Sequence, residues 1–193
     1  MIGVAVMVAV ALGMSLYVWR ERGRVDRTEA IAAATQPVAP PASGPTEQVT
    51  LYAAYDDAGA LRAQTVRIPL PAGRQARALE ILRALLAVYL DKASPHPLAP
   101  GAEIRDVYLV DPGLAVIDLN AAFANNHRSG VLVEELTLAS LVETLSANVP
   151  GITRIKILVE GKDRETLAGH VDLTSFYEVP AIHTLAAQLQ AVP

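Results

Sequence analysis

The sequence predicts an α/β (α+β) domain in which two helices pack on one mixed β-sheet, in the order ββαββαβ, behind an N-terminal transmembrane helix. Three observations lead to this prediction. The hydrophobic period changes from helical to strand-like within residues 131–161, positions 1–19 carry no charge, and a proline-rich segment follows that uncharged run. The chain therefore divides into an anchor (1–19), a basic and Pro/Ala-rich linker (20–47), a folded domain (48–178) and a C-terminal tail with a short amphipathic helix (179–193).

The predicted anchor spans Met1 to Trp19, and a helix of that length covers about 28 Å, close to the hydrocarbon thickness of a bilayer. Tyr17 and Trp19 lie at its end, where interfacial aromatic residues are expected, and four arginines follow within residues 20–27. A cleavable signal peptide is the alternative, but no basic segment precedes the run and no small-x-small site precedes Arg20. We therefore expect a single-pass anchor in the cytoplasmic membrane.

The first half of the domain begins with two predicted strands, residues 48–55 and 65–70, joined by the turn signal Asp56-Asp57-Ala58-Gly59. A helix is predicted over residues 75–90, where leucines recur at helical spacing. The prolines at positions 37, 40, 41 and 45 predict an extended linker before the folded domain.

The second half begins with strands 104–110 and 114–119, which flank the hairpin signal Asp111-Pro112-Gly113. The next helix ends at Pro150-Gly151 and carries one apolar stripe, made by Leu138, Leu141, Val142, Leu145 and Val149. On its opposite face, Thr137, Ser140 and Thr144 are expected to meet water. Alternating isoleucine and valine residues after this helix predict a strand with one buried face.

This helix, turn and strand resemble the signature of the GerMN domain family, the sporulation and spore germination domain. The segments are LASLVETLS and VPGITRIKILVEGK, and two further stretches, residues 113–123 and 169–176, are similar to other strands of the family. The resemblance covers about residues 49–176 and implies a structural role for its signature residues, which are Leu138, Ala139, Val142, Thr144, Leu145, Pro150, Gly151, Glu160 and Gly161.

Membrane orientation is predicted differently by two observations. The arginines follow the apolar span, so the positive-inside rule places the domain in the cytoplasm. The family resemblance implies a domain that works outside the cytoplasmic membrane, and a start assigned too late would reconcile the two. We expect the domain on the extracytoplasmic side.

Composition excludes several functions. A net charge of −4 argues against nucleic-acid binding, which needs a concentrated basic face. The absence of cysteine excludes disulfides, thiol catalysis and Cys-ligated metal. The histidines at 96, 127, 170 and 183 have no ligand spacing and are expected in turns or on the surface. No nucleophile elbow or phosphate-binding glycine loop is present. The sequence therefore predicts no catalytic residue, no metal, no cofactor and no enzymatic activity.

Basic residues around the last strand are the candidate docking surface: Arg154, Lys156, Lys162 and Arg164. The alternative is an ordinary solvated strand face.

These observations favour a membrane-tethered, non-enzymatic module for protein–protein interaction or assembly in the cell envelope. Its expected partners are envelope proteins or further copies of the chain, together with the membrane through the anchor, and no nucleic acid. The alternative function is a peptidoglycan-binding module that assists a wall hydrolase.

Overall fold

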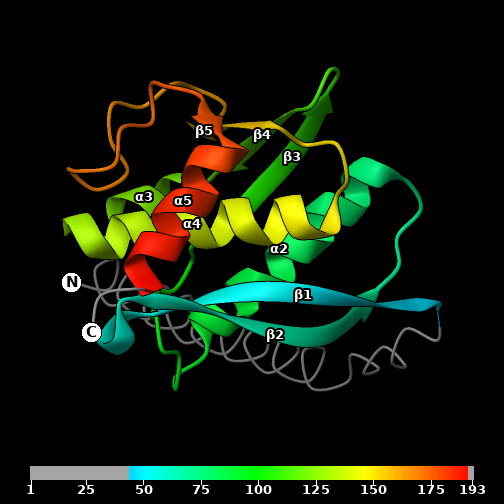
Figure 1. Cartoon of the computed structure of the whole chain (residues 1–193), viewed down its shortest axis with the longest axis horizontal. Helices are drawn as coiled ribbons and strands as arrows, with labels where there is room; N and C mark the ends of the chain where they lie inside the picture. The colour runs from blue at the N-terminus through cyan, green and yellow to red at the C-terminus, as the bar shows by residue number, and fades with distance from the viewer. Residues whose placement is uncertain (1–43, 191–193) are drawn as a thin grey trace, which may run out of the picture. The chain divides into compact units, whose positions relative to one another are not determined.

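The computed structural model describes residues 44–190 of the chain. Its strands are β1 (Thr46–Tyr55), β2 (Ala60–Pro69), β3 (Ile104–Val110), β4 (Leu114–Leu119), β5 (Arg154–Val159) and β6 (Tyr177–Glu178) (Figure 1). Its helices are α2 (Arg74–Leu90), α3 (Ala121–Asn125), α4 (Val131–Asn148) and α5 (Val179–Gln190), with a short 3-10 turn, η1 (Asp56–Ala58). The α+β class is confirmed.

Within the described residues, the strands form two separate sheets and not the single mixed sheet predicted. β1 and β2 pair antiparallel from Thr46↔Pro69 to Tyr55↔Ala60. The second sheet has the order β3-β4-β5-β6, with β4 and β5 parallel and the outer pairs antiparallel. The prediction of one sheet is wrong because alternation along a strand shows which face is buried, but not which strand lies beside it.

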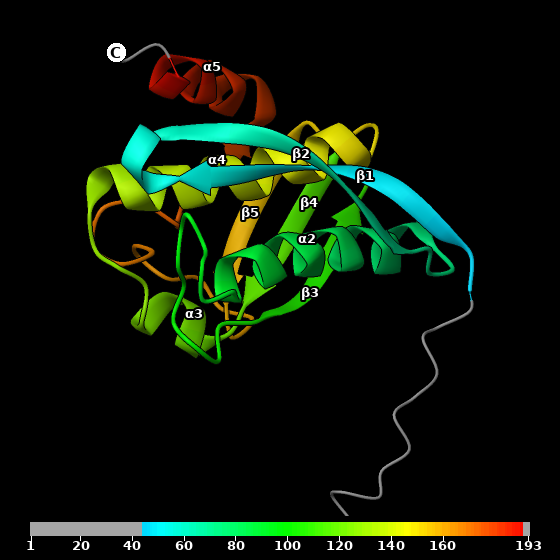
Figure 2. The same ribbon diagram turned by 90° about the horizontal axis from the view of Figure 1, so that it is seen from below.

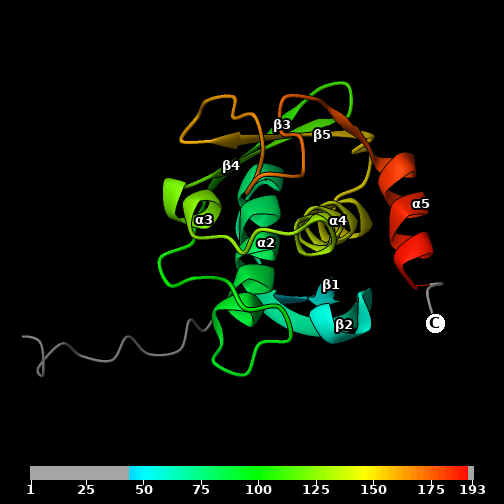
Figure 3. The same cartoon turned by 90° about the vertical axis from the view of Figure 1, so that its left-hand side faces the viewer.

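Helices α2 and α4 lie side by side between the two sheets, which gives the domain three layers (Figures 2 and 3). α4 contacts β1 on one side, and α2 contacts both β1 and β3. Helix α3 adds to the predicted helices, whereas α5 lies within residues 179–193, where the sequence predicts a short C-terminal helix, and it packs along α4 and against β2. A helix in a middle layer must be compatible with burial on two sides.

The polar side of α4 is buried, which overturns the prediction that Thr137, Ser140 and Thr144 meet water. All three side chains are 0% exposed. A single apolar stripe predicts a helix with one buried face, whereas here the second face is covered as well. Short hydroxyl side chains are tolerated in that position because each finds a hydrogen-bond partner.

Side chains of α2 and α4 bind the edge of β1 by accepting hydrogen bonds from its alternate N–H groups, at positions 50, 52 and 54. The Asn148 side-chain oxygen accepts the first at 3.0 Å, and its amide nitrogen donates back to the carbonyl of Thr50 at 2.7 Å. The hydroxyls of Thr144 and Tyr89 accept the second and third, each at 2.9 Å. These bonds satisfy an edge that a two-stranded sheet would otherwise leave unpaired.

We expect Thr144→Val to lower the free energy of unfolding by about 1–3 kcal/mol, because valine keeps the volume but leaves the N–H of Tyr52 without its acceptor. Urea unfolding of the domain followed by circular dichroism measures this. Ser146→Ala, at a half-buried position of the same helix, is the matched control and should cost under about 0.5 kcal/mol. Equal midpoints for the two variants would show that Thr144 only fills space.

The predicted anchor (1–19) and most of the linker (20–47) lie outside the described residues. In the part of the chain that is described, no helix is long and apolar enough to cross a membrane. The C-terminal residues predicted to form a tail contain α5, whose side chains Val179, Ile182 and Ala186 are buried.

Candidate functional site

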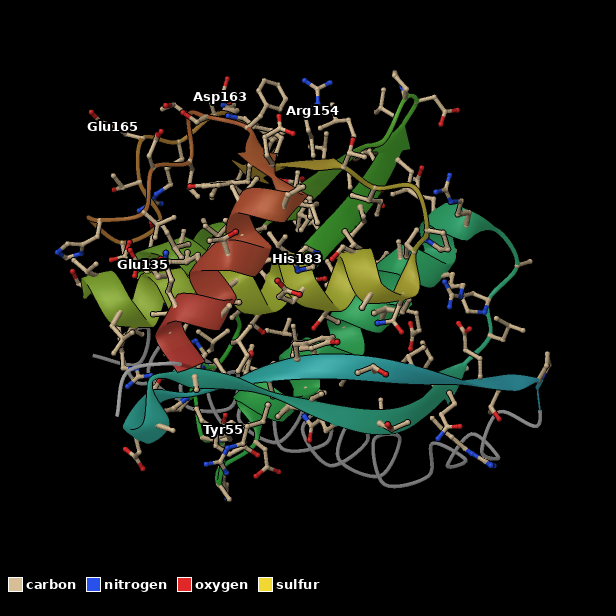
Figure 4. The ribbon with its side chains drawn as sticks, viewed as in Figure 1. Tyr55, Glu135, Arg154, Asp163, Glu165 and His183 are labelled. Atoms are coloured by element: carbon tan, nitrogen blue, oxygen red, sulfur yellow. The ribbon has the colours of Figure 1, made fainter. Side chains whose placement is uncertain are left out.

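Of the four predicted docking residues, Arg154 lies on the face of the second sheet that points away from α4 (Figure 4). Its guanidinium carbon is 5.7 Å from the centroid of the Phe176 ring, within the range of a cation–π contact. The strand register places Leu114 and Val110 in the same cross-strand row as Arg154. On its other side, Arg154 pairs with Glu178 of β6, so it is a partly exposed cation between an apolar and an acidic neighbour.

Lys156 does not point into solvent as expected, because it is buried, with 7% exposure. Its ammonium donates to the carbonyls of Leu173 and Thr174 at 2.6 and 2.7 Å and lies 2.8 Å from the Asp163 carboxylate. The segment that follows β5 folds back over this strand position and covers it. Lys156 is thus a tether for that segment, and it is not available for docking.

Lys162 and Arg164 belong to the loop after β5, where they alternate with acidic residues. Lys162 is exposed, while Arg164 donates to the carbonyl of Thr166 at 2.9 Å and to the side chain of Asn125 at 2.7 Å. Figure 4 shows Asp163 and Glu165 on the same loop. The four predicted cations therefore do not form one continuous basic strip.

Large apolar side chains are exposed on the same side of the second sheet as Arg154. Tyr108 is 44%, Val110 48% and Phe176 53% exposed. The register pairs Tyr108 with Val116 of β4, which in turn lies opposite Lys156. We call this surface the outer sheet face, defined by Tyr108, Val110, Arg154 and Phe176.

A buried polar network joins the hairpin turn η1 to α4, and periodicity gave no signal for it. His96, fully buried and not in a surface turn as predicted, donates through Nδ1 to Asp56 at 2.6 Å, and its Nε2 is 2.7 Å from Thr137 Oγ1. On the other side of that hydroxyl, His127 Nε2 is 2.8 Å away. The Arg128 guanidinium also binds Asp56. The network holds together η1, the loop at His96 and residues 127–137, which are distant from one another in sequence.

The network contains an acid, a histidine and a hydroxyl in a row, the arrangement that activates a nucleophile in hydrolases. Here, however, Thr137 is 0% exposed. Its oxygen contacts His96 and His127, and it donates to the carbonyl of Val133 at 3.0 Å. A substrate atom has no approach to this hydroxyl, so the row works as an internal clamp.

We expect the domain to lose stability as pH falls from 7 to 5. Burial lowers the pKa of His96 and of His127, although Asp56 acts to raise the first. A histidine with a lowered pKa binds protons more readily in the unfolded chain, so its contribution to stability is present above about pH 6.5 and is lost below it. Thermal unfolding at pH 7, 6 and 5 should show a total loss of about 1–3 kcal/mol.

The matched comparison for this pH dependence is His127→Gln against His183→Gln. The first variant removes a buried titrating group, so its pH profile should flatten, whereas the half-exposed His183 pairs with Glu143 outside the network. A profile that is unchanged in both variants would assign the acid sensitivity to other groups.

A second polar cluster fixes the loop that precedes β6. Glu134 is fully buried, and one carboxylate oxygen accepts the N–H groups of Ala168, His170 and Val171, each at 3.0 Å. Burial acts to raise the pKa of Glu134, but the bonds from Val171, His170 and Ala168 outweigh it and hold the pKa at about 2. Glu134 is therefore a charged anchor inside the fold. An acidic residue in the first turn of a helix gives no sequence signal for this role.

Neither cluster is arranged as a metal site. Within residues 44–190, no group of three or more acidic or histidine side chains could hold a metal ion.

The model of the family described as "Germane: Sporulation and spore germination" matches residues 50–165, which is more than half of the chain. The structure of the tandem GerMN domains of the sporulation protein GerM from Bacillus subtilis is similar with a TM-score of 0.51 and 18% identity, over 68% of this chain and 45% of that one. The first GerMN domain of GerM gives a TM-score of 0.46 and 23% identity, over 67% and 94% of the two chains. No curated protein matches the chain.

Proposed function

Because this chain belongs to the Germane family, the family of sporulation and spore germination, we propose that it is a membrane-tethered, non-enzymatic module for protein–protein interaction or assembly in the bacterial cell envelope. In this proposal the apolar segment 1–19 is the tether, and the domain works on the outer side of the cytoplasmic membrane. Its partners are envelope proteins or further copies of the chain.

The observation that carries the proposal is the outer sheet face. Aromatic and arginine side chains are enriched at protein interfaces, and Tyr108, Phe176 and Arg154 come together here on a rigid sheet. The exposed positions lie on regular strands or beside them, so they are held in place before a partner arrives.

The polar clusters support the non-enzymatic part of the proposal. In the Asp56–His96–Thr137 row, the Thr137 hydroxyl is closed to solvent. The Glu134 carboxylate accepts hydrogen bonds from main-chain N–H groups. Both clusters hold segments of the chain together, so neither is free to act on a substrate.

Co-purification from envelopes tests the proposal with the full-length protein. The double variant Tyr108→Ser/Phe176→Ser should reduce recovery of partner proteins by about tenfold or more, because hot-spot aromatic residues each contribute about 2 kcal/mol. Leu90→Ser, an equally exposed apolar residue at the end of α2, is the matched control and should bind like the unmodified protein. If the double variant folds and recovers partners as before, the outer sheet face is not the docking surface.

A separate experiment tests on which side of the membrane the domain lies. A C-terminal alkaline phosphatase fusion should be active, because that enzyme matures only outside the cytoplasm, where its disulfides form. An inactive phosphatase fusion beside a fluorescent cytoplasmic reporter would place the domain inside.

Peptidoglycan binding is the second candidate, and the exposed rings of Tyr108 and Phe176 favour it because flat rings can also stack on sugar faces. Sedimentation with purified cell wall separates the two functions. The proposed protein-interaction module should stay in the supernatant, whereas a wall-binding module should sediment and lose this property in the double variant.

A further inference from the structure

A groove of about 530 Å³ lies between the first half of α4, α5 and the loop before β6, away from the outer sheet face. Its apolar lining comes from all three segments, through Val131, Leu138, Val171, Ile182 and Leu185. Val131 is 54% exposed at the rim, whereas Leu138, Val171 and Ile182 are at most 7% exposed. The volume lies within the range of about 300–1,000 Å³ that is typical of ligand sites.

The walls of the groove are fixed independently of any occupant. Glu134 holds the loop wall by three main-chain hydrogen bonds, and His170 adds a contact from Nδ1 to the same carboxylate at 2.9 Å. On the opposite wall, Glu143 of α4 pairs with His183 of α5 at 2.5 Å. A preformed groove loses little conformational entropy on binding, which favours affinity.

The rim of the groove is acidic. Glu135 lines the groove from α4 (Figure 4) and pairs with no cation of residues 44–190. Asp172 lies on the loop side, where hydrogen bonds from Thr174 and Ser175 hold its pKa at about 2, so it stays ionised. The lining thus carries two carboxylates, Glu135 and Asp172, beside an apolar floor, and among the described residues that line the groove the only basic one is His170. This pattern complements a cation that borders an apolar surface.

A peptide segment that binds in this groove has to satisfy its own backbone hydrogen bonds. The loop N–H groups of residues 168, 170 and 171 are already bonded to Glu134, and most of the other lining residues belong to α4 and α5. The only strand residue in the described lining is Tyr177 of β6, an edge strand of two residues, which is too short to pair with an extended peptide. A helix meets this requirement, because its hydrogen bonds are internal and its side chains at i, i+3 and i+7 reach into a groove.

We propose that this groove binds an amphipathic helix of a partner protein, whose apolar face enters between α4 and α5 and whose lysine or arginine residues flank it toward Glu135 and Asp172. The inference goes beyond the proposed function because it concerns a second surface. It can fail while docking at the outer sheet face holds, and the reverse is equally possible.

Disulfide trapping tests the proposal on the full chain, which contains no cysteine of its own. The probe is a synthetic helical peptide with leucines at i, i+3, i+4 and i+7, flanking lysines and one cysteine. Leu185→Cys places a thiol in the groove, and Thr184→Cys places one on the exposed side of the same helix. With the full chain solubilised in detergent, disulfide formation with the peptide should be at least tenfold faster at position 185 than at position 184.

Charge supplies the second readout. A peptide with glutamates in place of the lysines should be trapped at position 185 at least about fivefold more slowly than the lysine peptide. Adding Glu135→Lys to the Leu185→Cys chain should reverse that preference. Equal trapping at positions 184 and 185, a rate that ignores peptide charge, or a Leu185→Cys chain that forms only disulfide-linked homodimers would each overturn the proposal.

Discussion

Replacing Glu134 with alanine is expected to lower the free energy of unfolding by about 3–5 kcal/mol, the largest effect of any single substitution we consider. The carboxylate is fully buried and accepts three main-chain N–H groups, and a hydrogen bond to a charged acceptor makes a net contribution of about 1.5–3 kcal/mol. Alanine leaves those donors without a partner, and the loop before β6 loses its anchor. In a domain of this size the midpoint of thermal unfolding should fall by roughly 10 °C.

The neighbouring residue provides the matched control. Glu135 has the same charge and lies one position later on α4, but it points to the rim of the groove and forms no ion pair within the described residues. Glu135→Ala should change the stability by under about 0.5 kcal/mol. If calorimetry gives similar midpoints for the two variants, the buried hydrogen-bond cluster does not stabilise the fold as described.

Replacing Lys156 with methionine should be the second large loss, of about 2–4 kcal/mol. Methionine keeps the length of the side chain, but it cannot donate to the carbonyls of Leu173 and Thr174. Each buried carbonyl left without a donor costs about 1–3 kcal/mol. The ammonium also pairs with Asp163, which is largely exposed. The share of the stability loss that comes from this ion pair should therefore be small and should decrease with added salt.

Lys162→Met is the control for this change, since Lys162 is exposed on the same loop. It should leave the unfolding midpoint within about 0.5 kcal/mol of the unmodified domain. Hydrogen exchange would add a local readout, because the N–H groups of residues 167–173 should exchange faster in Lys156→Met only. Equal protection in both variants would show that Lys156 does not hold this loop.

Much of the fold could be predicted from the sequence because it depends on local patterns. The hairpin signal at Asp56 to Gly59 predicts the turn between β1 and β2, where Gly59 has a left-handed φ of 58°. The alternation around Ile155 and Ile157 predicts a strand whose inner face is buried, as observed.

The arrangement of the two sheets could not be predicted in this way. It depends on β1 binding side chains of α2 and α4, and hydroxyl residues such as Thr144 look polar until a covering strand is known. Lys156 is a similar case, because strand alternation predicts an outward direction but not that a later loop covers it. The buried network around His96 depends on contacts between residues 40 or more positions apart, and histidine spacing therefore gives no signal for it.

Docking of a partner protein on the outer sheet face is tested most directly by site-specific photo-cross-linking in cells. A photoreactive phenylalanine analogue is placed at Tyr108 or, as the control, at Leu90 of the full-length protein; both positions are similarly exposed. The account predicts a discrete cross-linked protein from position 108 that is absent from position 90 and that is lost when Phe176→Ser is added. Cross-linking that is absent from position 108, equal at the two positions or unaffected by Phe176→Ser would contradict it.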